Sequence, residues 1–499
     1  MLRFLLIALS LLLSLPALSP AQTYGTCSSN CTRYAGPAGG GTTCTAGDPC
    51  TLGYVGSVSA PGDNNCLLDG TYQGADQMLW MRVDDGDASG TAGNPISFCA
   101  VNDGAVTIDG EDVNNRYPIW ISGDIDYIVI EGVNAQDAGA DDTIINVGDD
   151  NCVGQPIETC RPDFLTLRRV GCIGYNTVRR NFNNGCLNFD TGEGHLIEDM
   201  FCVGIHRKCL SPVFRTLGST IRRAIIDAEG QDWDSGPIFG ITIGYHGFET
   251  RIENTICHWT NSEQTGAVAG NCFGSDSVSQ YDDFAYSPPE RIFGEVTDVT
   301  IGSAEVDHVL DASIAFTHNT YYDATASNDI DYGIRIGDPG SIVDNPDGAA
   351  WNGMRLSSNI AFLDTEANGN IPLGTRLHNG ANPDDNEITN SVNIGDTAND
   401  INVGWVSTNN NDYATVAAFI AAEPDSIYGS REHCYRTVDG TYTRIPLWPY
   451  PMAARMQAAQ AAAGETDYNM NEVLWDIFGN PPAHCRRDAN PQRTATFFG

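Results

Sequence analysis

The chain has 499 residues and a formal net charge of −38 at pH 7, from 64 acidic and 26 basic side chains. A surface this negative repels nucleic acids and anionic membranes, so we expect neither as a partner. The chain is long enough for two or three ordinary domains.

Residues 1–21 have the composition of a secretory signal peptide. They begin with one positive charge at Arg3, continue as a leucine-rich run, and end in small residues at Ser19 and Ala21. The apolar core is too short for a permanent membrane span. We therefore expect a secreted or periplasmic protein, and sixteen cysteines fit an oxidising compartment.

Residues 22–66 are rich in cysteine and glycine and predict a disulfide-rich N-terminal cap. The cysteines of this segment are Cys27, Cys31, Cys44, Cys50 and Cys66. Their connectivity stays open, because spacing alone does not determine it. The chain has no CxxC pair and no compact Cys/His cluster, so we expect no structural zinc.

The stretch from Gly39 to Asn134 carries a resemblance to a known superfamily. It contains "PGD" at 61–63, "DGTY" at 69–72, "GTAGNPI" at 90–96 and "VTIDG" at 106–110. This opening resembles that of right-handed parallel β-helix proteins of the pectate-lyase-like superfamily, most of all alginate lyases and chondroitinase B. The resemblance implies a β-helix that acts on acidic polysaccharides, with a lysine as base, an assisting arginine and often a calcium site.

Residues 67–430 show a weak internal repeat that predicts the same all-β fold from the residues themselves. In each repeat an aliphatic residue is followed two positions on by a polar residue or glycine, and three positions later by an apolar residue or cysteine. The polar or glycine positions are Gly132, Arg169, Asp199, Arg223, Asn254, Asn319, Asn359 and Asn390. Short alternating strands between turns of this kind are typical of a β-solenoid.

The repeat also predicts which side chains stack inside the coil. The inward row is expected to contain Cys172, Cys202, Ile226, Cys257, Ile301 and Phe362. In a second strand Cys186, Cys209 and Ile241 are expected to point inward, which leaves Lys208 on the outer face.

Lys208 is the only lysine in the chain and is the candidate catalytic base. β-Elimination from a uronate needs a base for the proton beside the carboxylate and a positive group that stabilises the charge developing on that carboxylate. Neighbouring His206 and Arg207 favour the neutral amine that a base requires. Arg207, Arg222 and Arg223 are candidate carboxylate partners, and His206 and His246 are candidate proton donors.

The surrounding segment is the most basic part of this acidic chain. From Arg168 to Arg223 there are nine basic and four acidic residues, and stacked coils can gather them into a patch that binds a carboxylated or sulfated polysaccharide. Further candidate substrate-binding residues are Arg179, Arg180, Arg215 and Tyr245. Alternatively, Arg168, Arg169, Arg222 and Arg223 pair with acids on neighbouring coils, and Lys208 is a solvated surface residue.

A cluster of carboxylates follows at "DAEGQDWDSG". Asp227, Glu229, Asp232 and Asp234 are candidate ligands for Ca²⁺, although their order is not that of an EF-hand loop. Two of them can instead be the acid and base of an inverting glycoside hydrolase. A solvated loop is the third interpretation.

Residues 431–499 predict a C-terminal cap segment with a short helix. The run "WPYPMAARMQAAQAAAG" places proline before an alanine-rich stretch and Gly464 after it. The sequence as a whole predicts a monomeric, exported right-handed parallel β-helix whose partner is an acidic polysaccharide. It is either a lyase, a glycoside hydrolase, or a non-catalytic carbohydrate-binding or structural β-helix.

Overall fold

The structure is a computed structural model, and it describes only part of the chain. The described residues are 30–139, 143–148, 161–174, 185–189, 192–204, 208–212, 216–227, 238–243, 250–253, 255–259, 270–275, 310–311, 315–317, 320–323, 330–336, 351–352, 355–357, 360–363, 387–389, 392–394, 406–408, 411–413, 418, 421–422 and 450–463. The predicted signal peptide lies outside them.

The described strands form three large parallel sheets, which we call A, B and C. Sheet A contains β1 (Arg33–Ala35), β2 (Asn64–Leu67), β5 (Ile96–Ala100), β8 (Ile128–Glu131), β11 (Thr166–Arg168), β15 (Leu196–Glu198), β19 (Thr220–Arg222), β22 (Arg251–Glu253), β26 (Ala315–Thr317), β30 (Arg355–Ser357), β32 (Glu387–Thr389) and β34 (Val406–Thr408). Sheet B contains β4 (Leu79–Arg82), β7 (Ile119–Ser122), β10 (Ile145–Val147), β13 (Gly185–Phe189), β17 (Lys208–Pro212), β21 (Ile238–Ile243), β24 (Gly270–Ser275) and β28 (Ile330–Ile336). Sheet C contains β3 (Gly70–Tyr72), β6 (Val106–Asp109), β9 (Val133–Gln136), β12 (Gly171–Ile173), β16 (Phe201–Val203), β20 (Ile225–Asp227), β23 (Ile256–Trp259), β27 (Thr320–Asp323), β31 (Ile360–Leu363), β33 (Val392–Ile394) and β35 (Asn411–Tyr413).

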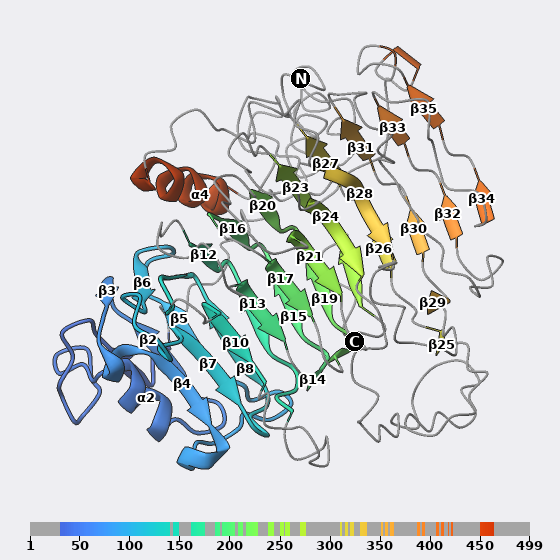
Figure 1. The fold of residues 1–499 in the computed structure, drawn as a ribbon. Helices are drawn as coiled ribbons and strands as arrows, with labels where there is room; N and C mark the ends of the chain where they lie inside the picture. Colours follow the sequence, from blue (N-terminus) through green and yellow to red (C-terminus); the bar gives the residue numbers. More distant parts are fainter. Residues whose placement is uncertain are drawn as a thin grey trace, which may run out of the picture.

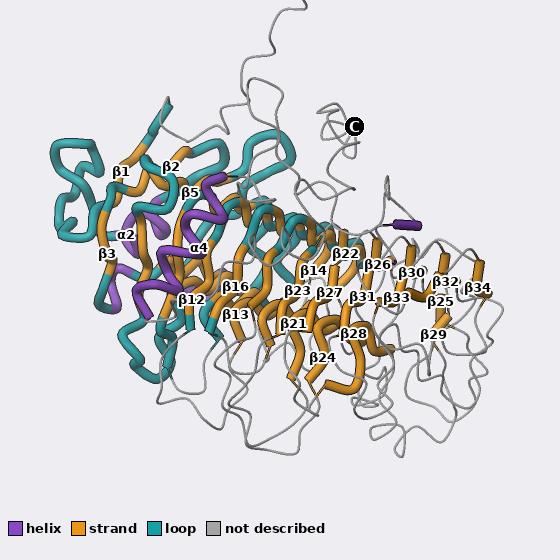
Figure 2. The backbone as a smooth tube through the Cα atoms, turned by 90° about the horizontal axis from the view of Figure 1, so that it is seen from above, coloured by secondary structure: helices purple, strands orange, loops and turns teal. Residues whose placement is uncertain are grey.

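The chain visits the three sheets in a fixed order, and each visit makes one coil. It runs through sheet B, then sheet A, then sheet C, as in β7, β8 and β9, before β10 returns to sheet B. Successive coils pair in parallel, which gives the stack of strands in Figures 1 and 2. Parallel crossovers of this kind are right-handed. The predicted right-handed parallel β-helix is therefore confirmed.

The corner between sheets A and C is a turn of one residue at Gly132 and of two residues at Arg169, Asp199 and Arg223, and the first residue of each turn is left-handed. The φ angles are 77° at Gly132, 50° at Arg169, 54° at Asp199 and 54° at Arg223. Each backbone N–H reaches the next coil, as from Arg169 to the Glu198 carbonyl at 3.1 Å. These are the predicted polar or glycine positions of the repeat. Asn254, Asn319, Asn359 and Asn390 lie outside the described residues.

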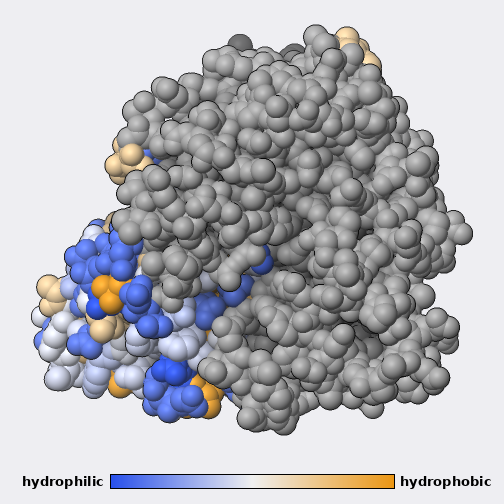
Figure 3. Space-filling view, viewed as in Figure 1, coloured by the Kyte–Doolittle hydropathy of each residue, from blue (hydrophilic) through white to orange (hydrophobic). Residues whose placement is uncertain are grey.

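The core is the stack of inward side chains that the repeat predicts. Cys172, Cys202, Ile226 and Cys257 occupy one register row of sheet C, and each is at most 1% exposed. Cys186, Cys209 and Ile241 of sheet B are fully buried, but Ile241 is in register with Leu210 and not with Cys209, so the predicted row is one position off at Ile241. The outer surface of the described N-terminal coils is mostly hydrophilic (Figure 3).

The predicted inward row is wrong at Phe362. Cys257 pairs with Tyr321, which pairs with Ala361, so Phe362 lies one position beyond the row. The reason is that β26 and β30 end at Thr317 and Ser357, one residue earlier than the repeat predicted. Ile301 lies outside the described residues.

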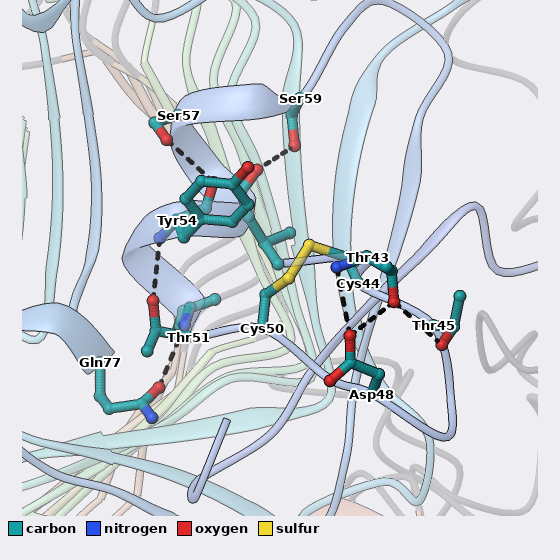
Figure 4. Close-up of a disulfide and its surroundings, with 12 residues drawn as sticks. Thr43, Cys44, Thr45, Asp48, Cys50, Thr51, Tyr54, Ser57, Ser59 and Gln77 are labelled. Atoms are coloured by element: carbon teal, nitrogen blue, oxygen red, sulfur yellow. Dashed lines mark hydrogen bonds between the residues drawn. A yellow bond between two sulfur atoms is a disulfide. The ribbon is translucent and has the colours of Figure 1, made fainter. Parts of the chain in front are cut away.

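The N-terminal end of the coil is closed by a short helix and disulfides. Helix α2 (Leu52–Val58) packs against β4 and β1, and disulfides join Cys31 to Cys66 and Cys44 to Cys50. Figure 4 shows the second disulfide beside the helix start, where the Thr51 hydroxyl accepts the Tyr54 N–H and the Gln77 side chain accepts the Leu52 N–H. The predicted disulfide-rich cap is present, and β1 and β2 within it already belong to sheet A.

The predicted C-terminal helix is α4 (Tyr450–Ala463), and it lies on a side of the coil. It packs on β12 and β16 of sheet C, where Met452 and Met456 are buried (Figure 1). Arg455 reaches between the coils and donates hydrogen bonds to the carbonyls of Arg169, at 2.6 Å, and Val133, at 2.7 Å. We expected this helix to cap the last coil. It instead covers the outer face of sheet C at β12 and β16.

The remaining described elements are short. They are the 3-10 turns η2 (Ala75–Gln77) and η3 (Val83–Asp85), and two small sheets, β14 (Gly192–Glu193) with β18 (Thr216–Leu217) and β25 (Leu310–Asp311) with β29 (Trp351–Asn352). None of the helices in the described ranges is long and apolar enough to cross a membrane.

Candidate functional site

Lys208 is the first residue of β17 in sheet B. In the sheet it pairs with Gly185 of β13 and Phe239 of β21. Its side chain is half-buried, whereas Cys209 next to it is fully buried. The outward position of Lys208 stays a prediction, because Leu210, two positions further along the strand, is fully buried.

Two disulfides join sheet C to sheet B at this edge of the coil. Cys172 of β12 is bonded to Cys186 of β13, and Cys202 of β16 is bonded to Cys209 of β17. The second disulfide closes the segment of chain that contains His206 and Arg207. The backbone that carries Lys208 is therefore fixed on one side by a covalent link and on both edges by neighbouring strands.

Arg222 belongs to a row of alternating charges at the end of the sheet A strands. Glu131, Arg168, Glu198, Arg222 and Glu253 share one register position on β8, β11, β15, β19 and β22. Arg168 Nε lies 2.6 Å from Glu198 Oε1, and Arg222 Nη2 lies 2.6 Å from Glu198 Oε2. The Glu198 carboxylate is thus placed between the guanidinium groups of two neighbouring coils.

Arg223 belongs to a second, deeper row at the turn. Its Nε donates to Asp199 Oδ1 at 2.6 Å and its Nη2 donates to Glu198 Oε2 at 2.8 Å. Arg169, only 2% exposed, is bound to Asp103 at 3.0 Å and Glu131 at 2.5 Å. Buried arginines of this kind are stable only because carboxylates compensate their charge.

The pKa values of Glu198 and Glu131 are shifted in opposite directions. Burial alone would raise the pKa of Glu198, but Arg223, Arg222 and Arg168 together hold it at about 2. Burial dominates at Glu131 and raises its pKa, although Arg169 and Arg168 oppose the shift. Glu198 is therefore more firmly ionised than Glu131.

The alternative that these arginines pair with acids on neighbouring coils is confirmed for Arg168, Arg169, Arg222 and Arg223. The structure also separates two of the candidates from the proposed base. Arg222 and Arg223 lie at the corner between sheets A and C, whereas Lys208 begins a strand of sheet B. Sheet C lies between these two corners of the coil.

Most of the other candidate residues lie outside the described residues. These are His206, Arg207, Arg179, Arg180, Arg215, Tyr245, His246, Glu229, Asp232 and Asp234. Asp227 ends β20, where its backbone is in register with Val203 and His258. Within the described part of the chain, no group of three or more His, Cys, Asp or Glu residues is arranged to hold a metal ion.

The sequence analysis missed a stack of carboxylates at the corner between sheets B and A. Asp126 Oδ1 accepts the Asp163 N–H at 2.9 Å, and Asp163 Oδ1 accepts the Glu193 N–H at 2.8 Å. Burial raises the pKa of Asp163 to about 7 in spite of Arg161, which lies 3.3 Å away. The signal was present in the sequence. In "DYI" and "DFL" an acidic residue stands two positions before an aliphatic residue, and "EGH" lies at the same point of the next coil.

A row of aromatic and amide side chains on the outer face of sheet B was missed as well. Trp80, Trp120, Asn146 and Asn188 share one register position on β4, β7, β10 and β13. All four are half-buried. The alternation of "LWMR" and "IWIS" marks both tryptophans as outward-facing.

No protein-family model matches the sequence, and no curated protein matches it. Solved structures with a similar fold include an alginate lyase from Paenibacillus sp. str. FPU-7, at 13% identity and a TM-score of 0.39 over 77% of this chain and 100% of that one. A rhamnogalacturonan lyase matches at 14% identity and a TM-score of 0.45, over 83% of this chain and 95% of that one. A lacto-N-biosidase from Eubacterium ramulus matches at 9% identity and a TM-score of 0.36, over 76% of this chain and 67% of that one.

At these identities and TM-scores the similarity is one of fold. The chain is a parallel β-helix, as the pairing of the strands in its three large sheets shows. A fold of this kind carries more than one chemistry, so the function has to come from the residues of this chain.

Proposed function

We propose that this chain is an exported enzyme that cleaves an acidic, uronate-containing polysaccharide by β-elimination on the outer face of sheet B. The observation that carries the proposal is the position of Lys208. It is the only lysine in the chain, it begins β17 with a half-buried side chain at the corner between sheets C and B, and the Cys202–Cys209 disulfide fixes its backbone. A half-buried amine on a rigid strand is suited to act as a positioned base.

In the proposed reaction, Lys208 Nζ removes the proton from the carbon beside the uronate carboxylate. The electron pair of that C–H bond forms the new double bond, and the glycosidic oxygen leaves with the bonding pair of its own C–O bond. Negative charge develops on the carboxylate, and a cation beside it lowers the barrier. Arg207 is the proposed cation because it adjoins Lys208 in the chain, and His206 and His246 remain proposed donors to the leaving oxygen.

Arg222 and Arg223 have a structural role in this proposal. Their guanidinium groups are bound to Glu198 and Asp199, and withdrawing them would leave those buried carboxylates uncompensated. Calcium binding by Asp227, Glu229, Asp232 and Asp234 stays a prediction, and the proposed reaction takes no step through the metal.

Export supports the choice of a polysaccharide as substrate. The described disulfides persist only in an oxidising compartment, and the first 21 residues have the composition of a signal peptide. A protein in that location meets cell-wall and extracellular glycans.

A non-catalytic carbohydrate-binding β-helix is the second candidate function. It is favoured by the ion pairs of Arg168, Arg169, Arg222 and Arg223, which remove four cations from the patch that the sequence suggested. Such a protein would bind a glycan and leave it intact.

One experiment separates the candidate functions. The purified protein is incubated with alginate, pectate and glycosaminoglycans, and the ultraviolet absorbance of unsaturated chain ends is followed. A lyase produces that absorbance, a hydrolase produces new reducing ends without it, and a binding protein produces neither while it retains the glycan. Absence of the absorbance across the panel would contradict the proposed function.

A further inference from the structure

The outer row of sheet B extends along the coil axis from the N-terminal end to the strand before Lys208. It consists of Trp80, Trp120, Asn146 and Asn188, which follow one another on the adjacent strands β4, β7, β10 and β13 (Figure 1). Strands in a sheet are about 4.8 Å apart, so the four steps from β4 to β17 span about 19 Å. A linear polymer that runs along this face would meet one side chain of the row in each coil.

The two tryptophans form an aromatic cluster at the N-terminal end of the row. Their ring centroids are 5.8 Å apart in an edge-to-face arrangement, and the Tyr117 ring lies 5.0 Å from Trp120. The Arg82 guanidinium lies over the Trp120 ring at 4.3 Å. Trp80 Nε1 donates to the Tyr117 carbonyl at 2.7 Å, which fixes that ring. The rings are half-buried, so each presents an edge or part of a face to the outside.

Two hydrogen-bond donors of this cluster are left without an acceptor. Trp120 Nε1 and Arg82 Nε are shielded from water and have no hydrogen-bond partner in the structure. Shielded donors are normally paired, because an unpaired one has lost its hydrogen bonds to water and gained none in return. Rotation of either half-buried side chain can present its donor to an acceptor on a ligand.

We propose that Trp80, Trp120 and Arg82 form a remote binding platform for a sugar ring of the same polysaccharide chain. A pyranose ring has an apolar C–H face that packs on aromatic rings, and its oxygens can accept hydrogen bonds from the two unpaired donors. Asn146 and Asn188 supply amides between this platform and the coil of Lys208. The identity of the ligand rests on the proposed function, whereas the platform itself does not depend on catalysis by Lys208.

The charges around the platform indicate how it binds. Asp84 and Asp85 in η3 are exposed beside Arg82, and Arg82 Nη1 lies 3.4 Å from Asp85 Oδ2. A polyanion gains little from a single arginine next to these carboxylates. Packing and hydrogen bonds therefore supply the affinity at this end, and the contribution of the platform should change little with salt.

The test measures binding in a Lys208→Ala background, so that the glycan stays intact. Isothermal titration with oligouronates of increasing length compares this protein with the same protein carrying Trp80→Ala or Trp120→Ala. We expect each tryptophan substitution to weaken the binding of oligomers long enough to span the row by about tenfold, and to leave the binding of disaccharides unchanged. Equal binding of all lengths by parent and variants would overturn the platform, and tighter binding of a neutral glucan than of the oligouronates would contradict the acidic ligand.

Two further variants control for misfolding and for losses of binding that do not involve the row. Trp120→Phe keeps an aromatic ring but loses the donor, so it should retain folding and show a smaller loss than Trp120→Ala. Tyr54→Ala removes a ring that is 45% exposed on α2, outside the row, and should bind every oligomer as the parent does. A loss in Tyr54→Ala equal to that in Trp120→Ala would count against the platform.

The outcomes also separate this inference from the proposed function. If the wild-type protein releases no unsaturated ends but the tryptophan variants lose affinity for long oligouronates, the lyase proposal fails and the platform stands. If elimination occurs and the tryptophan variants bind and turn over long chains normally, the platform fails and the lyase proposal stands.

Discussion

Arg223 and Asp199 form a buried ion pair one coil apart, with Arg223 Nε 2.6 Å from Asp199 Oδ1 and side-chain exposures of 8% and 1%. Both residues occupy left-handed turn positions at the corner between sheets A and C. The chain uses charge pairs where an uncharged polar ladder would also fit the turn, and the stability of the coil depends on their completeness.

Removing Arg223 should therefore destabilise the protein strongly. Arg223→Ala leaves Asp199 almost fully buried without its partner, and we expect a loss of about 3–5 kcal/mol in the free energy of unfolding. Chemical denaturation followed by circular dichroism measures it. Arg222→Ala is the matched control, because Arg222 is more exposed, at 20%, and should cost less. Equal losses in the two variants would contradict the buried pair.

The pH dependence of stability should carry the signature of Asp163. Its folded pKa of about 7 lies above the unfolded value of 3.8, so the folded state binds the proton more tightly. The stabilisation is complete below about pH 4 and is lost as pH rises through about 7. Asp163→Asn should flatten this part of the profile of thermal unfolding against pH.

Glu198 should give the opposite sign and so serves as the internal control. Its pKa is lowered to about 2 from 4.5, so the stabilisation is present above about pH 4.5 and is lost as pH falls through about 2. Glu198→Gln should lower stability at neutral pH and remove the acid part of the profile. A profile unchanged by both substitutions would contradict the assigned burial of these carboxylates.

The disulfide between Cys202 and Cys209 should matter for activity more than for stability. Replacing both cysteines by alanine removes a closure of 7 residues, worth about 2.5 kcal/mol in the chain-entropy model. It also frees the start of β17, so the rate of unsaturated-end formation should fall in the folded variant. The Cys44→Ala/Cys50→Ala protein loses a closure of 6 residues far from Lys208. This control protein should lose similar stability and keep its rate of unsaturated-end formation. An equal loss of rate in the two double variants would contradict a role for the Cys202–Cys209 disulfide in positioning Lys208.

Arg455 should hold helix α4 on sheet C. Its guanidinium donates to the carbonyls of Arg169 and Val133 and to Asn134 Oδ1 at 2.6 Å, and its side chain is 9% exposed. Arg455→Ala should cost about 2–3 kcal/mol, because three buried acceptors lose their donor. Hydrogen exchange in α4 should rise while the sheets stay protected. Gln457→Ala on the same helix is the control, and protection of α4 that survives Arg455→Ala would contradict this anchor.

The sequence was sufficient to predict the coil, because its period is local. Each repeat carries its own turn residue and inward side chain, so Arg169, Asp199 and Arg223 mark the turns and Cys172 and Cys202 mark the core without any knowledge of distant contacts. The error at Phe362 arose because β30 ends at Ser357, one residue earlier than the repeat predicted, a change that a single polar residue does not reveal.

Contacts between coils were harder to predict, because loops of variable length hide the register. Trp80 and Trp120 are adjacent in sheet B but 40 positions apart in sequence, and Glu198 lies between two arginines, Arg168 and Arg222, that are 30 positions before it and 24 after it. The basic segment was visible as a local excess of charge. Whether each arginine faced a ligand or a carboxylate depended on the register of the neighbouring coils.

The most direct test of the account is the rate at which Lys208→Ala forms unsaturated ends on the best substrate of the panel. If Lys208 is the base, that rate should fall by at least about 100-fold while the thermal unfolding midpoint and the affinity for long oligouronates stay close to those of the wild type. A folded Lys208→Ala protein that retains the wild-type rate would contradict the proposed mechanism.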